Sequence, residues 1–390
     1  ESLTCELFGA HKLLQDIKKL ENKNIKVVPG PCMGRCNVAP TVCVGKNYVD
    51  VANFDKVKKT IDEKTFVPFI PDYINLSSYK KKGGYEIANK IKNGVISKKQ
   101  VLDSLNESGL KGKGGAGFPT GKKWEIVSNY NGKKYVAVNG DEGEPGTFKD
   151  RSYLESDPHR FLEGALIASY FINAQKVYIY MRDEYPTVIK ILLDEINKME
   201  DEEIIPKDFF IVRRGAGAYI CGEESAMIES IEGKRGLPRH RPPYVAEIGL
   251  FGCPTLTNNL ETLFWVRDII EKGAKWFAEK GSNGNKGFHS FSVSGRVKNP
   301  GVKVAPAGIT IQQLIDEYCD GMADGHTFKG YLPGGASGGI LPATMNDIPL
   351  DYGSKELMDA GCFLGSAAVV VLSDHDNMKD VALNLLKFFE

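Results

Sequence analysis

The chain has 390 residues, of which 42% are hydrophobic, and its 50 basic and 50 acidic side chains leave no formal net charge. This balance gives no electrostatic reason to expect nucleic acid or an anionic membrane as a partner, and no run approaches the roughly 20 apolar residues of a transmembrane segment. The length predicts two to four domains of roughly 100–200 residues. No secretory signal opens the sequence, and eight cysteines in a chain of this size favour thiols or metal ligands in a cytoplasmic protein over a disulfide framework.

The first 70 residues are predicted to form a small domain of alternating helices and strands. Helical apolar spacing covers residues 7–20 and 54–61, and strands are expected at 25–28 and 41–44. A turn-rich loop, PGPCMGRC, follows the first strand and places Cys32 and Cys36 in a C-x-x-x-C pair. The alternation is thioredoxin-like, and thiolates on loops are the usual ligands of iron–sulfur clusters. Two buried thiols without a metal are the alternative interpretation of the pair.

Glycines and lysines are interleaved in LKGKGGAGFPTGKKW, residues 110–124. Backbone amides that glycine leaves accessible, flanked by lysines, make a positive seat for a phosphate. Phe118 and Trp124 are expected to add flat apolar surfaces at its edge. The segment fits G-x-G-x-x-G, but residues 98–110 before it have helical spacing, whereas a dinucleotide fingerprint follows a strand. We therefore expect a nucleotide loop outside the ordinary dinucleotide fold, with a basic surface loop as the alternative.

Polar residues follow a predicted strand at 134–138, in the sequence NGDEGEPGTF. Groups at the end of a strand are placed for binding in open α/β sheets. Three acids, Asp141, Glu142 and Glu144, would repel a phosphate. They are better suited to ribose hydroxyls, a flavin ring edge or a nicotinamide amide, and an acidic surface turn is the alternative.

Two further segments have the same character. The elements expected next are strands at 176–180 and 209–213 and helices at 185–198, 225–231 and 260–270. The loop GAGAYICGEE opens the second of these helices, whose N-terminus could hold an anion, although Glu223 and Glu224 argue against a bare phosphate. A basic, proline-rich stretch at 232–244 follows. Asn258 and Asn259, just before the third helix, can donate to a phosphate or a ring carbonyl.

The last hundred residues are predicted to form a small α/β module and a final strand and helix. The expected strands are 287–297, 301–304 and 365–374, and the expected helices are 311–318 and 378–389. The glycines of GGASGG, residues 334–339, are interpreted as a connecting loop rather than a second phosphate loop. Cys319 and Cys362 lack the spacing of cluster ligands and are expected in the core.

Together these segments resemble, over nearly the whole chain, the flavin- and NADH-binding subunit of respiratory complex I and of NAD-linked hydrogenases and formate dehydrogenases. The resemblance implies an α/β multidomain fold in four parts: a thioredoxin-like [2Fe-2S] domain at 1–70, a Rossmann-like FMN/NAD(H) domain at 71–285, a ubiquitin-like (SLBB) domain at 286–345, and residues 346–390 leading to a helical [4Fe-4S] domain beyond residue 390.

The resemblance also implies the site residues. Those expected to contact FMN are Gly112, Gly114, Lys123, Asn139, Asp141, Tyr219, Gly222, Glu223, Asn258 and Asn259. Those expected on the NAD(H) side are Phe118, Glu142, Glu144, Glu224, Arg241 and Tyr244. Arg241 and Tyr244 replace a lysine and a phenylalanine that are common in the family; guanidinium still pairs with phosphate and tyrosine still stacks. No catalytic acid or base is expected, because hydride passes through FMN.

For the iron–sulfur cluster, the family uses a C-x-x-x-x-C pair followed by a C-x-x-x-C pair. Cys5, Cys32 and Cys36 match three of these ligands, and the fourth would fall one position before Glu1. Cys43 lies in a predicted strand and is expected in the core rather than as a replacement ligand.

Within the family, residues 366–390 look most like the β subunit of NAD-linked formate dehydrogenase. That assignment implies reduction of NAD+ alongside iron–sulfur subunits and a molybdenum- or tungsten-bearing subunit. The alternatives are the diaphorase subunit of an NAD-linked or electron-bifurcating hydrogenase, with a NiFe or FeFe subunit as partner, and the complex I subunit. A different class is an assembly module that keeps the FMN fold without turnover.

Overall fold

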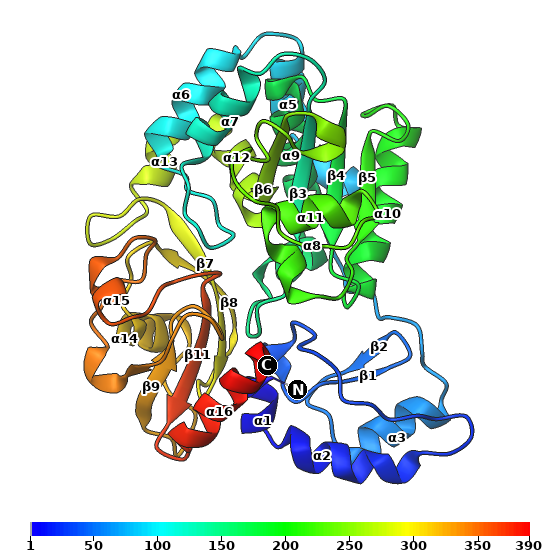
Figure 1. The fold of residues 1–390 in the computed structure, drawn as a ribbon, viewed down its shortest axis with the longest axis vertical. Helices are drawn as coiled ribbons and strands as arrows, with labels where there is room; N and C mark the ends of the chain where they lie inside the picture. Colours follow the sequence, from blue (N-terminus) through cyan, green and yellow to red (C-terminus); the bar gives the residue numbers. More distant parts are fainter. Residues whose placement is uncertain (1) are drawn as a thin grey trace. The chain divides into compact units, whose positions relative to one another are not determined.

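The structure, a computed structural model, describes residues 2–390, and its contacts divide the chain into two compact units (Figure 1). One, called here the flavin unit, comprises Ile70–Gly143 and Asp150–Phe288; the other, the terminal unit, comprises Glu1–Phe69, Glu144–Lys149 and His289–Glu390. The prediction of an α/β fold is confirmed, whereas the four predicted domain spans stay predictions. Across residues 2–390, none of the helices combines the length and apolarity needed to span a bilayer.

A four-stranded parallel sheet forms the centre of the flavin unit, in the order β5-β4-β3-β6. Its strands are β3 (Tyr135–Gly140), β4 (Lys176–Met181), β5 (Phe210–Arg214) and β6 (Thr255–Asn259). The helices of this unit are α4 (Leu76–Lys80), α5 (Glu86–Lys92), α6 (Lys98–Ser108), α7 (Thr120–Ser128), α8 (Lys149–Ser156, beginning at the boundary), α9 (Pro158–Ile172), α10 (Pro186–Asp201), α11 (Glu224–Ile231), α12 (Leu260–Lys272) and α13 (Ala274–Ala278).

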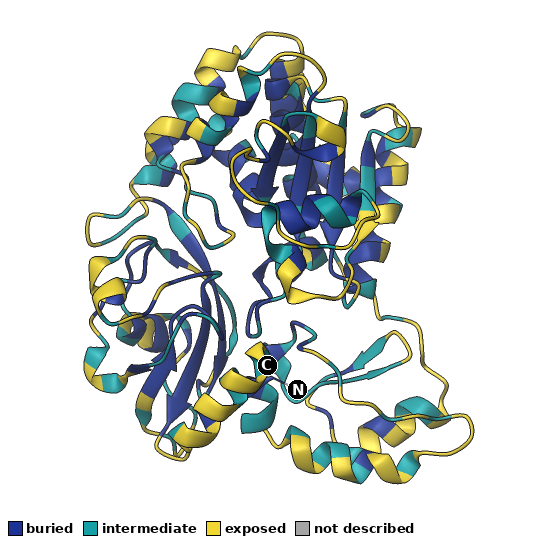
Figure 2. Cartoon of the chain, viewed as in Figure 1, coloured by how far each residue is buried: buried dark blue, intermediate teal, exposed yellow. Residues whose placement is uncertain are grey.

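Helices cover both faces of this sheet. Val136, Val138 and Ile179 pack into one large cluster with apolar residues of α9 and α12. The alternate residues Ala137 and Tyr178 pack on the opposite side with residues of α11. Because side chains alternate along a strand, strands buried on both faces read as continuous apolar runs, and these were recognisable in the sequence. Figure 2 shows the resulting dark-blue sheet.

The terminal unit contains a mixed five-stranded sheet in the order β10-β9-β11-β7-β8. Its elements are β7 (Phe288–Gly295), β8 (Gly301–Pro306), α14 (Ile311–Gln313), β9 (Phe328–Leu332), β10 (Leu341–Pro342), α15 (Lys355–Asp359), β11 (Ala368–Ser373) and α16 (Met378–Phe389). Strand β11 runs parallel to β7 and antiparallel to β9. All six of its residues are buried, as the run of Ala and Val predicted, and Cys319 and Cys362 are buried in the same core.

The N-terminal part of this unit is much smaller. It consists of α1 (Leu3–Leu7), α2 (Ala10–Ile17), the hairpin β1 (Val42–Val44) and β2 (Asn47–Val49), and α3 (Phe54–Asp62). Leu3 packs with residues of β9, β11 and α16, and the Thr4 hydroxyl lies 3.0 Å from that of Ser294. Helix α1 is thereby held against the five-stranded sheet.

The helix predicted at 7–20 is confirmed as α2 with a 3-10 turn at Lys18–Leu20, but it begins only at Ala10, because Gly9 adopts φ = 84°, a conformation that favours glycine. The strand predicted at 25–28 does not form, since the described residues show only an isolated bridge between Asn22 and Ile25. Pro29 and Pro31 offer no amide donors to extend a ladder, and Val28 is exposed.

The helix predicted at 311–318 is also irregular, because α14 passes into a wider π-type turn at Leu314–Tyr318. Cys43 is only partly buried, so its expected place in the core is wrong. The other predicted elements are confirmed within a few residues, including the helix before the glycine–lysine loop, α6, which ends at Gly109 as expected.

Candidate functional site

The strand order of the flavin unit identifies a binding edge. Strands β3, β4 and β5 follow one another outward, whereas β6 returns to the other side of β3. Open parallel sheets bind ligands beyond the carboxyl ends of the strands at such a reversal. Here β3 ends in Asn139 and Gly140, and the register pairs Asn139 with Asn259 at the end of β6. The sequence therefore supplies amides on both sides of this point.

The glycine–lysine loop reaches the same edge. The Lys113 amide donates to the Thr262 hydroxyl at 2.9 Å, and the Lys123 ammonium donates to the Thr257 hydroxyl at 2.9 Å. A Cβ added to Gly114 would lie 3.2 Å from the Cβ of Asn259, closer than most side chains approach one another. Glycine at 114 thus lets the loop backbone lie directly over the end of β6.

The segment after β3 and the loop before α11 meet beside it. The Asn139 amide donates to the Gly222 carbonyl at 2.8 Å, and the Asp141 amide donates to the Asn139 side chain at 3.1 Å. The Asn259 amide donates to Asp150 in α8 at 2.7 Å and to the Asn139 carbonyl at 3.4 Å. The structure therefore brings all four sequence segments within the flavin unit to one place.

The two adjacent acids at the start of α11 have different partners. Glu223 caps the helix by accepting from the amides of Ser225 and Ala226, and it forms an ion pair with Arg241. Glu224 accepts from Lys123 at 3.2 Å and from Thr257 at 2.7 Å. Burial raises the pKa of Glu224, but the Lys123 charge and these hydrogen bonds outweigh it and lower that pKa overall. Glu224 is thus held as a carboxylate.

Asp141 carries an unsatisfied polar atom at this site. Its Oδ2 atom is buried and makes no hydrogen bond. Burial raises the pKa of Asp141 to about 7, with Glu184 adding to the rise and Arg182 opposing it. A buried polar atom without a partner is costly, and a ligand is one way to satisfy it. Together with the glycine-lined backbone, this atom fits a flat heterocycle that has a polar edge, as FMN does.

Aromatic residues around these segments divide into two groups. Phe118, Tyr219 and Tyr244 are 43%, 43% and 57% exposed, and an exposed aromatic ring is suited to stacking on a flat ligand. Trp124, which was expected at the edge of the loop, is fully buried, and its indole donates to Asn258 at 2.9 Å. That expectation is wrong, because Trp124 lies in the core and connects the glycine–lysine loop to β6 through this hydrogen bond.

Two of the acids predicted on the NAD(H) side, Glu142 and Glu144, accept hydrogen bonds from other parts of the protein. Glu142 is buried, and its carboxylate accepts from the amides of Asp150 and Arg151 and from the Tyr185 hydroxyl, at 2.8, 3.1 and 3.1 Å. It therefore caps α8. Glu144 belongs to the terminal unit, where its Oε1 accepts from the amide and hydroxyl of Ser337 at 2.7 and 3.0 Å.

Three residues that bind predicted site acids were not identified from the sequence. Arg182 donates to the Glu142 carbonyl at 2.8 Å, Thr257 binds Glu224, and Ser337 binds Glu144. Arg182 could have been predicted as a binding-edge residue, because a charged side chain there directly follows the buried strand β4. Ser337 lies in the loop that was interpreted as a connection; it does connect β9 and β10, but it also binds an acid.

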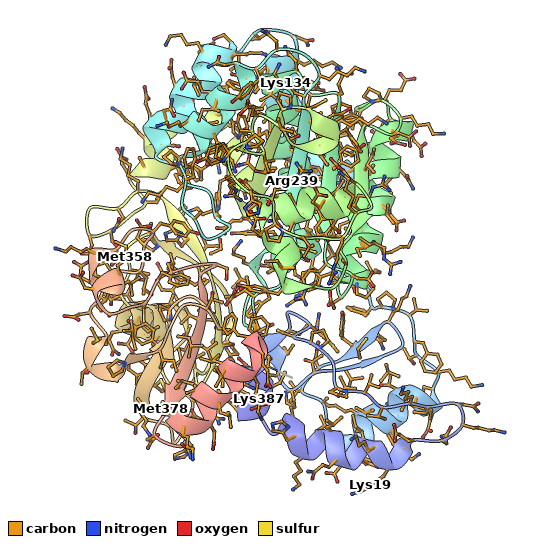
Figure 3. The ribbon with its side chains drawn as sticks, viewed as in Figure 1. Lys19, Lys134, Arg239, Met358, Met378 and Lys387 are labelled. Carbon is orange, nitrogen blue, oxygen red and sulfur yellow. The ribbon has the colours of Figure 1, made fainter. Side chains whose placement is uncertain are left out.

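Basic residues between α11 and β6 mostly pair with acids. Arg239, labelled in Figure 3, forms ion pairs with Glu229 of α11 and Glu232 at its end. Arg241 alone of this stretch reaches the site acids, pairing with Glu223 and lying 3.5 Å from Glu224. A guanidinium already held at this edge is suited to meet an incoming phosphate.

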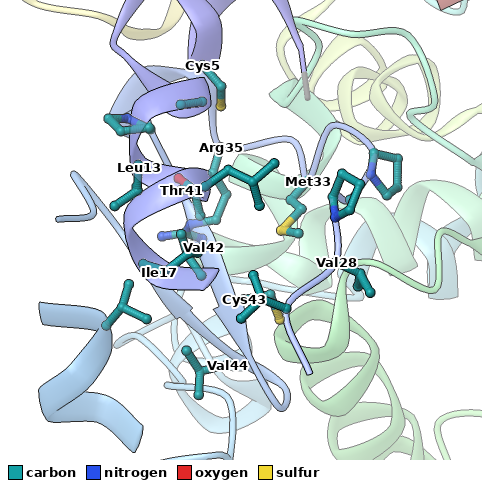
Figure 4. Close-up of a pocket in the computed structure, with 18 of the residues that line it drawn as sticks. Cys5, Leu13, Ile17, Val28, Met33, Arg35, Thr41, Val42, Cys43 and Val44 are labelled. Atoms are coloured by element: carbon teal, nitrogen blue, oxygen red, sulfur yellow. The ribbon is translucent and has the colours of Figure 1, made fainter. Parts of the chain in front are cut away.

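A second candidate site lies in the N-terminal part of the terminal unit. A cavity of about 420 Å³, shown in Figure 4, is lined by residues of α2, β1 and the loop that replaces the predicted strand, and by Cys5, Cys32, Cys36 and Cys43. The sulfurs of Cys32 and Cys36 are 3.6 Å apart. Two thiolates on one tetrahedral ion, with bonds of about 2.3 Å, would lie about 3.8 Å apart.

The pKa shifts of the thiols separate Cys43 from Cys5, Cys32 and Cys36, the three cysteines predicted as cluster ligands. The hydrogen bond with Cys32 and burial raise the pKa of Cys36 well above its usual value, and Cys5 contributes to the rise. Burial and Cys32 likewise raise the pKa of Cys5. For Cys43, only burial raises the pKa, so it has no thiol neighbour of this kind.

Within residues 2–390, no three His, Cys, Asp or Glu side chains surround a single point as a ready-made metal site. Cys32 and Cys36 have the spacing of two ligands of one iron, and Cys5, which interacts electrostatically with both, would be a third of the four thiolates that a two-iron cluster takes. The cavity supplies room for such a group.

Comparison with known proteins agrees with the flavin edge. The profile of the Nuo51 FMN-binding domain matches residues 105–268, which include the glycine–lysine loop and the ends of β3 and β6. The fold and this edge define an FMN-binding α/β protein.

Two relatives are F subunits of NADH-quinone oxidoreductases. The one of Rhizobium meliloti, designated F 2, is 42% identical over 82% of this chain and 77% of the relative, and the one of Aquifex aeolicus is 40% identical over 82% and 75%. The chain belongs to this family of NADH-quinone oxidoreductase F subunits. An NAD+-reducing [NiFe]-hydrogenase, in its air-oxidised state, matches with a TM-score of 0.84 and 27% identity over 99% of this chain and 70% of that one.

Proposed function

We propose that the chain is the NADH:acceptor oxidoreductase, or diaphorase, subunit of a larger complex, exchanging electrons between NAD(H), FMN and iron–sulfur centres. The observation that carries this proposal is the convergence of four segments at the reversal point of the sheet, around the unsatisfied Oδ2 of Asp141. Membership of the NADH-quinone oxidoreductase family described above supports the flavin and the nicotinamide substrate.

The residues proposed to bind FMN are those expected from the sequence: Gly112, Gly114, Lys123, Asn139, Asp141, Tyr219, Gly222, Glu223, Asn258 and Asn259. When bound, FMN supplies a centre that takes two electrons as hydride and releases them singly. The glycines permit close approach of the backbone, Lys123 supplies positive charge, and Asp141 offers its free oxygen to a polar ring edge. At a pKa of about 7, Asp141 can either hold a proton at that oxygen or accept one.

The residues proposed for NAD(H) are Phe118, Glu142, Glu144, Glu224, Arg241 and Tyr244. Of these, the exposed rings of Phe118 and Tyr244 are suited to stacking, and Arg241 is suited to phosphate. Glu142 is proposed to position the segment rather than to contact NAD(H), since its carboxylate oxygens already accept hydrogen bonds from the amides at the start of α8. No side chain has to transfer a proton to substrate, so the chain's task is to bind, orient and exclude water.

The test is reconstitution of the purified chain with FMN, followed by NADH–ferricyanide assays. We expect a yellow protein that turns over, and loss of FMN in Lys123→Ala but not in Lys122→Ala, a matched change at the exposed neighbouring lysine. A colourless wild type that takes up no FMN would refute the proposal. Bound FMN without turnover would instead identify an assembly module.

We further propose that the complex is an NAD-dependent formate dehydrogenase, on the resemblance of residues 366–390. The second candidate is an NAD-linked hydrogenase, supported by the structural match of 99% of this chain to an NAD+-reducing [NiFe]-hydrogenase. Metal analysis of the co-purified complex separates the two. Molybdenum or tungsten supports the first, and nickel or iron alone supports the second.

A further inference from the structure

A six-residue segment joins the predicted nicotinamide acid to the thiol site. Residues Glu144–Lys149, called here the strap, leave the flavin unit in sequence and belong to the terminal unit. The strap is anchored to the five-stranded sheet and its loops at three points. Glu144 accepts from Ser337, the Thr147 and Ser366 hydroxyls lie 2.6 Å apart, and the Phe148 amide donates to the Ser292 hydroxyl at 3.0 Å.

The opposite side of the strap contacts the cysteine pair. The Phe148 ring is 1% exposed and forms one buried cluster with Cys32 and Cys36, against which Val302 packs. Gly146, two residues earlier, makes a backbone hydrogen bond to Cys36. Its φ of 99° favours glycine, and a Cβ there would lie 3.4 Å from Ala368 and 3.5 Å from Val370 of β11. These are ordinary van der Waals distances, so the strap backbone lies in contact with β11 on one side and with the thiols on the other.

We propose that the strap is the wall of the iron–sulfur centre held by Cys32 and Cys36, and that it sets the reduction potential of that centre. This inference rests on the cluster named in the proposed function. The two contacts act in opposite directions. An N–H donated to a ligand sulfur stabilises the more negative, reduced state and raises the potential. The Phe148 ring excludes water that would also stabilise the reduced state, and so it lowers the potential.

The experiment is an EPR-monitored redox titration of the full chain with its FMN and cluster. In Phe148→Ser, which admits water beside the sulfurs, we expect the midpoint potential of the [2Fe-2S] signal to shift upward. In Phe148→Leu, which keeps an apolar cover, the shift should be smaller in size. The matched control is Phe291→Leu, a fully buried phenylalanine of the same unit that belongs to a different apolar cluster, with no expected shift.

Ser292→Ala provides a second, milder variant. It removes the acceptor of the Phe148 amide and leaves the strap's own contacts with the thiols in place. We therefore expect full cluster content and a midpoint potential between those of wild type and Phe148→Ser. This variant keeps the inference testable if Phe148→Ser fails to assemble its cluster. Because the readout is a potential and not activity, a purely structural role for Ser292 would leave it unchanged.

The outcomes separate the two proposals. Midpoints that stay at the wild-type value in Phe148→Ser, or in Phe148→Leu and Ser292→Ala if the serine variant lacks its cluster, overturn the strap's role while leaving the cluster assignment intact. A wild-type protein that never yields a [2Fe-2S] signal after anaerobic reconstitution contradicts the cluster itself. Shifts confined to the strap variants, with none in Phe291→Leu, support the inference.

Discussion

The flavin edge and the thiol cavity differ in how completely the polypeptide builds them without a cofactor. At the flavin edge, Asn139, Glu224 and Asn259 are already paired with neighbouring groups, and one carboxylate oxygen of Asp141 is left over. Around the thiols there is a cavity of about 420 Å³ and a two-stranded hairpin whose residues are mostly half-buried (Figure 2).

This difference has a thermodynamic meaning. A site whose polar groups satisfy one another folds before its ligand arrives, and the ligand adds only its own binding free energy. A small domain with a hollow interior has little apolar burial to offset chain entropy, so a metal group there contributes to folding itself. We therefore expect FMN to be exchangeable and the cluster to be structural.

The strongest test of the contrast is Cys32→Ser. We expect complete loss of the [2Fe-2S] signal and rapid proteolysis within residues 2–69, because the ligand pair that closes the cavity is broken. FMN content and NADH–ferricyanide activity should stay near wild type. Cys43→Ser, at a half-buried thiol without a thiol neighbour, serves as the control and should keep the cluster. Loss of FMN in Cys32→Ser would show that the flavin edge also depends on the cluster for its structure.

Glu144 tests whether the terminal unit contributes to nicotinamide binding. Glu144→Ala should raise KM for NADH about tenfold, equivalent to about 1.4 kcal/mol, with FMN retained. Steady-state kinetics together with FMN content measure both effects, and Glu356→Ala, at an exposed acid of the same unit, is the control. Release of FMN with an unchanged KM would show that the acid serves the flavin instead.

Glu142 tests how far the flavin edge is built by internal contacts. Glu142→Ala leaves the start of α8 uncapped and the buried Tyr185 hydroxyl without this acceptor, so it should lower the free energy of unfolding by about 2 kcal/mol. Chemical denaturation of the FMN-free protein measures this. Glu86→Ala, at an exposed acid in the first turn of α5, should cost only a few tenths of that amount. Equal losses in the two variants would contradict the capping role.

A further prediction concerns Asp141, whose buried Oδ2 makes no hydrogen bond. Burial raises the pKa of Asp141 from 3.8 to about 7, so between these values the folded, FMN-free protein holds a proton that the unfolded chain has released. The stability that this group provides is therefore full below about pH 4 and is lost as the pH rises to about 7.

Asp141→Asn removes this pH dependence. We expect Tm of the FMN-free variant to exceed that of wild type at pH 8 and to match it near pH 4, because only the wild-type protein loses the buried proton of Asp141 between these values. Calorimetry at the two pH values, with Asp72→Asn at an exposed position of the same unit as control, decides the matter. A variant less stable than wild type at pH 8 would mean that the ionised carboxylate has a partner.

Much of the flavin unit was predictable because its signals are local. The strands buried on both faces read as apolar runs, α6 before the loop excluded the ordinary dinucleotide fold, and Asn258 and Asn259 were recognised as binding groups just before a helix, although the strand β6 that they end was not predicted. Glycine, amide and acid segments could be assigned to one site only through the family resemblance, since their convergence depends on the order of strands in the sheet.

What could not be predicted depends on tertiary partners. Trp124 and Glu142 look like site residues by type and position, yet a single acceptor on β6 and three donors around α8 draw them into the interior. The run at 25–28 has the composition of a strand but lacks a neighbour to pair with. Nothing in the local sequence around Glu144 indicates that Ser337, 193 residues away, binds it.

The path of the chain has a practical consequence. It passes between the two units at residues 69/70, 143/144, 149/150 and 288/289, so no single cut separates them. A recombinant fragment spanning 70–288 would carry the strap without Ser292, Ser337 and Ser366, which anchor it, and would expose Phe148 to solvent.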